Sequence, residues 1–173
     1  EIRDRETAEI AIQSALTGHL LFSTLHTNDA AGAVSRLLDM GVESFLLSST
    51  LLGVLAQRLV RLICPECKEL AKPDERMIKS MGMDPGETEG VEFFAGRGCE
   101  ACRYTGFRGR TAIFEYLPVD SDMRKQITNR ATTEAIKDLA FEKGLVTLRQ
   151  DGWRKVRQGI TTISEVLRVT LEK

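Results

Sequence analysis

The arrangement of the cysteines constrains this sequence more than any other feature. All four fall into two C-x-x-C pairs, Cys64-Pro-Glu-Cys67 and Cys99-Glu-Ala-Cys102, with the 31 residues 68–98 between them. Two such pairs can supply four thiolates in a tetrahedron, which is the geometry that structural Zn²⁺ prefers. No cysteine is left over for an open catalytic position. We therefore predict one structural zinc ion per chain, held by all four sulfurs.

Two alternatives to a zinc site stay open on sequence alone. The cysteines could form two disulfides, or they could be four unrelated thiols. The gap between the pairs is longer than the usual range of about 15–20 residues, and we interpret the excess as an insertion. A redox pair is disfavoured, because neither C-x-x-C lies between a strand and the start of a helix, as it would in a thioredoxin-like unit.

Basic and aromatic side chains surround the second pair, a combination that is typical of nucleic-acid binding. They are Arg97, Arg103, Tyr104, Phe107, Arg108 and Arg110. The cluster is short, Glu66 and Glu100 interrupt it, and the net charge of the whole chain is −1. We therefore expect no nucleic-acid partner, although a zinc-stabilised docking or nucleic-acid-binding module stays open as an alternative function.

Length and composition indicate a soluble protein. The chain has 173 residues, of which 42% are hydrophobic and 28% charged, and a chain of this size can bury a core without disulfides. The longest apolar stretch, 45–60, is too interrupted by polar residues for a membrane span. We expect no signal peptide and a cytoplasmic location, where paired cysteines more often hold metal. The chain begins at Glu1 without Met, and we expect it to be a piece of a longer protein.

The spacing of apolar residues predicts an α/β organisation for the first third of the chain. The expected elements are a helix over 4–17, a strand over 20–25, helices over 29–41 and 43–57, and a strand over 59–63. The nearly continuous apolar run at 20–25 is typical of a strand buried on both faces of a parallel sheet. Such a sheet needs more strands than these, so we expect the missing ones upstream of Glu1.

The rest of the chain changes character twice. Residues 64–118 contain the cysteines, clustered glycines, short β-type runs at 91–94 and 111–114, and one short helix over 73–81. Residues 119–173 return to helices, and Thr162 and Glu165 have the spacing of a capping box. We therefore expect three parts: the end of an α/β core over 1–63, a zinc module over 64–118 and a helical subdomain over 119–173.

Two histidines flank the expected strand at 20–25. His26 lies at its C-terminal end, before residues that can cap a helix, which is where α/β folds place ligands. His26 is therefore a better site candidate than His19, although a structural histidine is the simpler interpretation. Glu1 belongs to the charged run Glu1-Ile2-Arg3-Asp4. Its carboxylate could hold Mg²⁺ through water, or it could belong to a solvated chain end.

Several stretches resemble the type II/type IV secretion superfamily of hexameric ATPases. Residues 1–7 are similar to the end of its Walker B segment, 17–28 to its histidine box, 56–67 to the passage into its tetracysteine motif, 105–115 to the stretch after that motif, and 157–166 to its C-terminal end. These stretches span essentially the whole chain in the right order. The resemblance implies the C-terminal half of a RecA-like P-loop NTPase core, with an inserted four-cysteine zinc module and a C-terminal helical subdomain.

The resemblance also implies roles for individual residues. Glu1 corresponds to the Walker B glutamate, which acts on Mg²⁺ and its water shell. His19 and His26 correspond to the histidine box, which senses the γ-phosphate of ATP. Cys64, Cys67, Cys99 and Cys102 correspond to the zinc ligands. The family's Walker A loop, G-x-x-x-x-G-K-[ST], is absent from these 173 residues, so we expect the chain alone to be inactive.

For the parent protein the resemblance implies a cytoplasmic homohexamer on the inner-membrane face. Its ATP hydrolysis would drive pseudopilus assembly in type II secretion. Its partners would be membrane platform proteins, including the cytoplasmic domain of the L-type membrane protein. Pilus-retraction members lack the cysteine module, and the cysteine spacing and C-terminal residues favour the secretion member over the pilus-extension ATPase, which stays an alternative.

Overall fold

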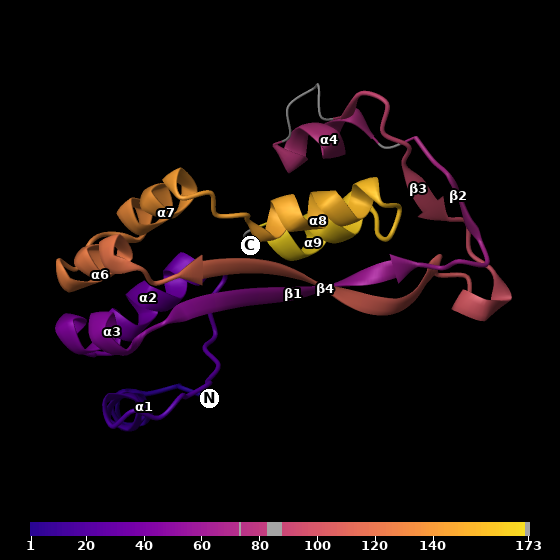
Figure 1. Cartoon of the computed structure of the whole chain (residues 1–173). Coiled ribbons are helices and arrows are strands. Elements are labelled where there is room, and N and C mark those ends of the chain that lie inside the picture. Colours follow the sequence, from indigo (N-terminus) through magenta and orange to yellow (C-terminus); the bar gives the residue numbers. More distant parts are fainter. Residues whose placement is uncertain (73, 83–87, 172–173) are drawn as a thin grey trace. The chain divides into compact units, whose positions relative to one another are not determined.

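The computed structural model describes residues 1–72, 74–82 and 88–171, and the chain divides into two compact units. Unit 1 consists of Glu1–Ala56 and Glu115–Val146, and unit 2 of Gln57–Phe114 and Thr147–Lys173. Two long strands, β1 (Gly53–Ile63) and β4 (Phe107–Pro118), pair with each other and contribute residues to both units (Figure 1). These two units are defined by contacts and are each made of two chain segments. The division into three successive domains, 1–63, 64–118 and 119–173, stays a prediction.

Unit 1 has five helices, and all but the third begin after a residue whose side chain caps them. They are α1 (Arg5–Leu16), α2 (Ala30–Asp39), α3 (Ser44–Thr50), α6 (Ser121–Thr128) and α7 (Thr133–Glu142). Asp4 caps α1 by accepting the Thr7 N–H, and Asp29 caps α2 by accepting the Gly32 N–H. These side chains satisfy donors that have no partner inside the helix. The helices predicted over 4–17 and 29–41 are confirmed.

The core of unit 1 joins its two chain segments. Buried apolar residues from the first segment pack against others from α6, α7 and the end of β4. The buried members are Ala8, Ile12, Ala30, Ala31, Val34, Leu37, Val42, Leu47, Leu117, Val119, Met123, Ile127, Ile136 and Ala140. Residues 115–146 are thus integral to the same core as residues 1–56.

The helix predicted over 43–57 is wrong beyond its first half. Helix α3 ends at Thr50, and β1 begins at Gly53. The Val119 N–H bonds the Leu52 oxygen, and the Cys64 N–H bonds the Gly106 oxygen, so β1 and β4 run antiparallel. The parallel arrangement expected for this strand is therefore also wrong. Pairing with β4, which begins only at Phe107, overrides the helical periodicity of the apolar residues.

The strand predicted over 20–25 is absent, and the prediction that this segment is buried is also wrong. This segment forms no strand, and Leu20, Leu21 and Phe22 are exposed. The Ile2 N–H bonds the Thr24 oxygen at 2.9 Å, but no ladder follows in the described part of the chain. A strand needs such a ladder to satisfy its backbone groups, so the apolar run alone does not form one.

Unit 2 contains a small hairpin-like sheet and helices. Strand β2 (Lys68–Leu70) pairs antiparallel with β3 (Phe94–Gly96), and Lys68 lies opposite Gly96. The helical elements are α4 (Glu75–Met81), the 3₁₀ turn η1 (Glu100–Cys102), α8 (Leu148–Arg157) and α9 (Ile163–Thr170). The short helix expected over 73–81 is confirmed as α4, while residue 73 lies outside the described residues. The β-type run at 111–114 lies in β4, but only Phe94 of the run at 91–94 lies in a strand.

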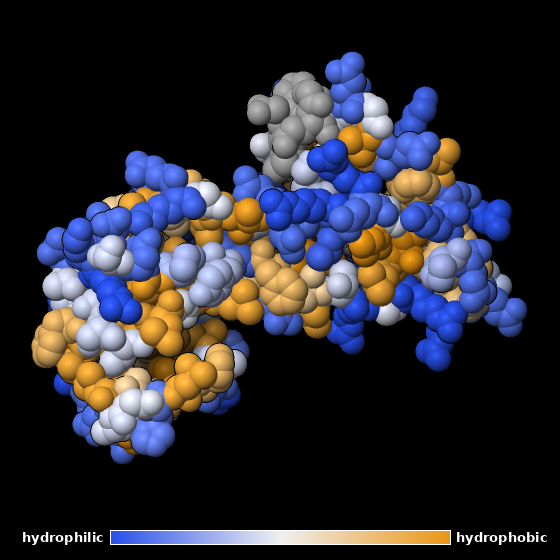
Figure 2. Space-filling model, viewed as in Figure 1, coloured by the Kyte–Doolittle hydropathy of each residue, from blue (hydrophilic) through white to orange (hydrophobic). Residues whose placement is uncertain are grey.

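Large apolar side chains remain exposed on unit 1. Ile10, Leu16, Leu20 and Phe22 are the most exposed near its N-terminus. Figure 2 shows hydrophobic side chains interrupting the hydrophilic surface in the region of α1 and α3. None of the helices in the described ranges has the length and apolar character that a membrane span requires.

Candidate metal centre and phosphate-sensing residues

The structure brings all four cysteines together in unit 2. Their sulfur atoms lie within 4.8 Å of one another. The Sγ–Sγ distance is 3.9 Å for Cys64 and Cys99, 3.9 Å for Cys67 and Cys102, and 3.7 Å for Cys99 and Cys102. A tetrahedron with Zn–S bonds of about 2.3 Å has sulfurs about 3.8 Å apart. The predicted cluster is therefore confirmed, and its geometry fits a zinc ion.

Backbone N–H groups point at the sulfurs from the surrounding turns. Cys67 Sγ accepts the Gly98 N–H at 3.3 Å, and Cys102 Sγ accepts the N–H groups of Cys99 and Gly106 at 3.2 and 3.3 Å. Such bonds stabilise thiolates and orient them toward a metal. All four cysteines are free, at separations far above the roughly 2.05 Å of a disulfide bond.

The thiols of the cluster differ in pKa. The N–H groups of Cys99 and Gly106 lower the pKa of Cys102 to about 6. Burial raises the pKa of Cys67 to about 12. A metal ion requires every ligand as a thiolate, so binding must release the proton that burial keeps on Cys67.

Glu1 and His26 also lie together, in unit 1. His26 Nε2 is 2.6 Å from Glu1 Oε1, and the Glu1 carboxylate also pairs with Arg3. The hydrogen bond from Arg3 lowers the pKa of Glu1, so this carboxylate is ionised at neutral pH. The side chain of His26 is 88% exposed and can therefore be reached from solvent.

His19 does not join this pair. Its Nδ1 lies 3.0 Å from Thr17 Oγ1 and 3.3 Å from the Ser14 oxygen, at the C-terminal end of α1. The two predicted histidines therefore have different surroundings. His26 faces an acidic group, while His19 contacts the turn that ends a helix.

Two buried carboxylates could not be assigned a role from the sequence. Glu115 lies in β4 and accepts the Ala30 N–H at 2.9 Å. Glu165 lies in α9 and was expected to complete a capping box with Thr162. The Thr162 side chain does accept the Glu165 N–H, but the Glu165 carboxylate points elsewhere. No local spacing signals the bond from Ala30 to Glu115 or the bond from Arg61 to Glu165, because these partners lie 85 and 104 residues away.

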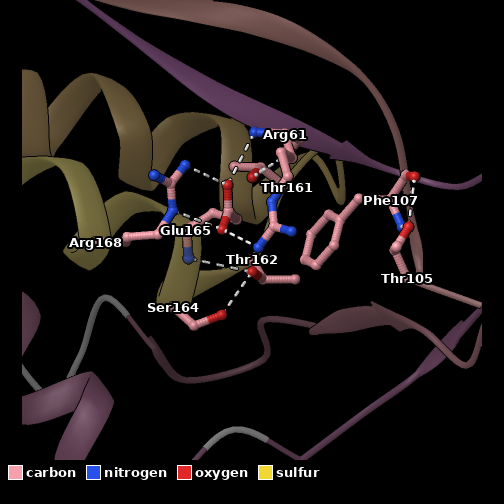
Figure 3. Close-up of polar contacts among 8 residues, drawn as sticks. All are labelled: Arg61, Thr105, Phe107, Thr161, Thr162, Ser164, Glu165 and Arg168. Carbon is pink, nitrogen blue, oxygen red and sulfur yellow. Dashed lines mark hydrogen bonds and ion pairs between the residues drawn. The ribbon is translucent and has the colours of Figure 1, made fainter.

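The carboxylate of Glu165 joins α9 to β1 (Figure 3). It accepts the backbone N–H of Arg61 at 3.1 Å and the Arg61 guanidinium at 2.6 Å. Two further bonds come from Arg168, at 2.8 and 2.9 Å. The Arg61 guanidinium also lies over the ring of Phe107, 4.2 Å from its centre. These contacts fix the last helix of unit 2 beside the strand that leads to Cys64.

Comparison with known proteins decides the family. A family model described as "Type II/IV secretion system protein" matches residues 1–168. The chain belongs to this family. It is 53% identical to the "Type II secretion system protein E" of Pseudomonas aeruginosa, covering 100% of the chain and 34% of that protein. It is 51% identical to the "Type IV pilus assembly ATPase PilB" of Thermus thermophilus, covering 99% of the chain and 19% of that protein. The chain thus spans about a third or less of these relatives.

Solved structures support the fold. The chain superimposes on the pilus retraction motor PilT bound to ADP with a TM-score of 0.62 and 22% identity, covering 99% of the chain and 38% of that structure. For the Yersinia pseudotuberculosis ATPase DotB the TM-score is 0.62 and the identity 19%, with coverages of 99% and 35%. The α/β fold expected from the resemblance is confirmed, as are the cysteine cluster and the helical C-terminal part.

Proposed function

We propose that this chain is the C-terminal part of a hexameric ATPase that powers type II protein secretion. The observation that carries this proposal is the family match over residues 1–168, which includes Glu1 and the histidine segment. The contact of 2.6 Å between His26 and Glu1 supports it further, because two groups expected at the nucleotide lie within reach of one another.

In this function the two groups have complementary chemistry. The Glu1 carboxylate would hold Mg²⁺ through its water shell, since hard cations prefer oxygen ligands. The His26 imidazole would donate a hydrogen bond to a γ-phosphate oxygen, and this bond can form only while ATP is intact. His26 can thus distinguish ATP from ADP. His19 would have a weaker role, because its ring is bonded to the end of α1.

The four cysteines would hold one structural zinc ion. Zinc would cross-link the end of β1 to the turn before β4 and so stabilise unit 2. A closed set of four sulfurs leaves no position for substrate, so the metal would have no part in hydrolysis.

The proposed setting is the cytoplasmic face of the inner membrane. There the homohexamer would drive pseudopilus assembly and contact the platform proteins, including the cytoplasmic domain of the L-type membrane protein. A pilus-extension ATPase is the second candidate, because the identities to the two kinds of relative, 53% and 51%, are nearly equal. In a deletion strain, loss of exported proteins with intact pili supports secretion, and the reverse supports pilus extension.

Two further candidates lack an ATPase role. One is a zinc-stabilised docking module, and the other is a nucleic-acid-binding module built on the arginines near the second cysteine pair. If the natural protein lacks a Walker A loop, the docking module becomes the better candidate. Salt-dependent binding to DNA or RNA would favour the nucleic-acid module.

The central test is steady-state ATP hydrolysis by the full-length protein as assembled hexamers. Losing one hydrogen bond to a charged group costs about 1.5–3 kcal/mol, so His26→Ala should lower turnover about ten- to a hundredfold. His19→Ala serves as the matched histidine control and should lower it less. Wild-type turnover in His26→Ala, or a larger loss in His19→Ala, would contradict the assigned roles.

A further inference from the structure

The turn that follows His26 is held by a buried carboxylate from a distant strand. Ala30, the first residue of α2, donates its backbone N–H to Glu115 Oε1 at 2.9 Å. Glu115 is only 6% exposed and lies 85 residues further along the chain. This N–H is one of the donors that a helix start cannot satisfy internally. The bond therefore fixes where α2 begins.

A second group of contacts restrains the same turn. The Asp29 carboxylate accepts the Gly32 N–H at 2.7 Å and pairs with Lys137 Nζ of α7 at 2.8 Å. The Thr27 hydroxyl donates to the backbone carbonyl oxygen of Asp29 at 3.1 Å. All these residues belong to unit 1. The backbone after His26 is thus anchored to β4 and to α7 at the same time.

The side chain of His26 contrasts with this anchored backbone. It is 88% exposed, and it contacts Glu1 at the surface of unit 1. A group that must meet a phosphate oxygen at hydrogen-bonding distance gains from a rigid support, because an error of about 1 Å removes most of the interaction. An exposed imidazole on a fixed turn is the arrangement that such a role requires.

We propose that Glu115 is a positioning residue for His26. By holding the Ala30 N–H, it sets the start of α2 and thereby the point from which the imidazole reaches the γ-phosphate. Glu115 does not touch the nucleotide in this role. The inference rests on the proposed ATPase function and deepens it by assigning a support to its phosphate-sensing residue.

The test uses steady-state kinetics of the full-length, zinc-loaded hexamer with MgATP. Glu115→Leu removes the acceptor at similar volume, and Glu115→Gln keeps an oxygen at the same reach. We expect Glu115→Leu to lower kcat about tenfold while KM changes by less than about twofold. Glu115→Gln should recover kcat to within about threefold of wild type.

The matched control is Asp151→Leu. Asp151 also holds a backbone N–H, that of Phe114 in β4 at 3.0 Å, but it belongs to unit 2. The Asp151→Leu substitution should leave kcat unchanged. A merely structural role of Glu115 predicts equal losses in both leucine variants, in parallel with their melting temperatures. That result would overturn the proposal.

A double-mutant cycle separates positioning from an independent effect. If Glu115 acts through His26, adding Glu115→Leu to His26→Ala should lower kcat by less than about twofold further. Independent, multiplying losses would overturn the proposal. Should Glu115→Leu not assemble, Glu115→Asp applies the same test, because it withdraws the oxygen by one methylene and should behave as the leucine variant does.

The outcomes also separate this inference from the function on which it rests. Wild-type kcat in Glu115→Leu, together with a strong loss in His26→Ala, would overturn the positioning role alone. Absence of turnover in the folded, zinc-loaded wild-type hexamer would overturn the proposed ATPase function, and the positioning role with it.

Discussion

Replacing Glu165 with glutamine tests how firmly the last helix is held to β1. Burial alone would raise the pKa of Glu165, but hydrogen bonds from Arg168 and Arg61 hold it lower, at about 2, against an ordinary value of 4.5. This difference corresponds to about 3 kcal/mol of stability at neutral pH. The arginine side chains are 53% and 44% exposed, so water screens the interaction and we expect about 2 kcal/mol.

The direction of the pH dependence follows from the lowered pKa. The folded pKa lies below the unfolded one, so the stabilisation is complete above about pH 4.5 and is lost as the pH falls toward 2. Unfolding in urea can be followed by fluorescence of Trp153, the single tryptophan, which is buried in unit 2 beside Phe93. The proteins to compare at pH 7, 5, 4 and 3 are wild type, Glu165→Gln and Glu69→Gln, an exposed glutamate of the same unit.

We expect Glu165→Gln to unfold about 2 kcal/mol more easily than wild type at pH 7, and this difference should shrink steadily below pH 4.5. Glu69→Gln should stay within about 0.5 kcal/mol of wild type. Loss of zinc on acidification affects all three proteins alike, so the difference between them isolates Glu165. A difference that is absent at pH 7, or that stays constant down to pH 3, would refute the reasoning.

Three further predictions concern the metal centre and the nucleotide. Elemental analysis of protein purified without chelator should find about one zinc per chain, and chelation should unfold the region around the cysteines before the helices of unit 1. The 173-residue chain should show no ATP turnover and no micromolar MgATP affinity by calorimetry, since it contains no glycine-rich phosphate loop with its lysine. Gly96→Ala should lower zinc retention, because a Cβ there would lie 2.0 Å from the Gly106 oxygen; unchanged zinc content after dialysis would contradict this.

Features fixed by neighbouring residues could be predicted from the sequence. Asp4 and Asp29 cap the helices predicted to begin there, and an N-cap needs only the next three residues. The cysteine cluster was predictable for a similar reason, since a C-x-x-C pair already places two sulfurs on one turn. In these cases at least part of the deciding geometry lies within a few residues of the signal.

Features decided by distant partners were not predictable. The apolar residues after Thr50 fit a helix as well as a strand, and only pairing with β4 selects the strand. Glu165 has capping-box spacing, yet its carboxylate accepts a hydrogen bond from Arg61, which lies 104 residues away. Glu115 shows no local sign of its contact with Ala30. The spacing of residues in one sequence does not indicate which distant residues will be in contact.

The two cysteine pairs meet although a long gap separates them in the sequence. Residues 68–98 leave the first pair through β2 and return through β3, with Lys68 opposite Gly96. The Arg97 N–H then bonds the Cys67 oxygen at 2.9 Å, which brings the chain back to the point it left. The number of residues in between changes the loop-closure entropy only slowly, so a gap of 31 residues costs little more than the usual shorter one. The spacing within each pair, rather than between the pairs, therefore determines whether four sulfurs can meet.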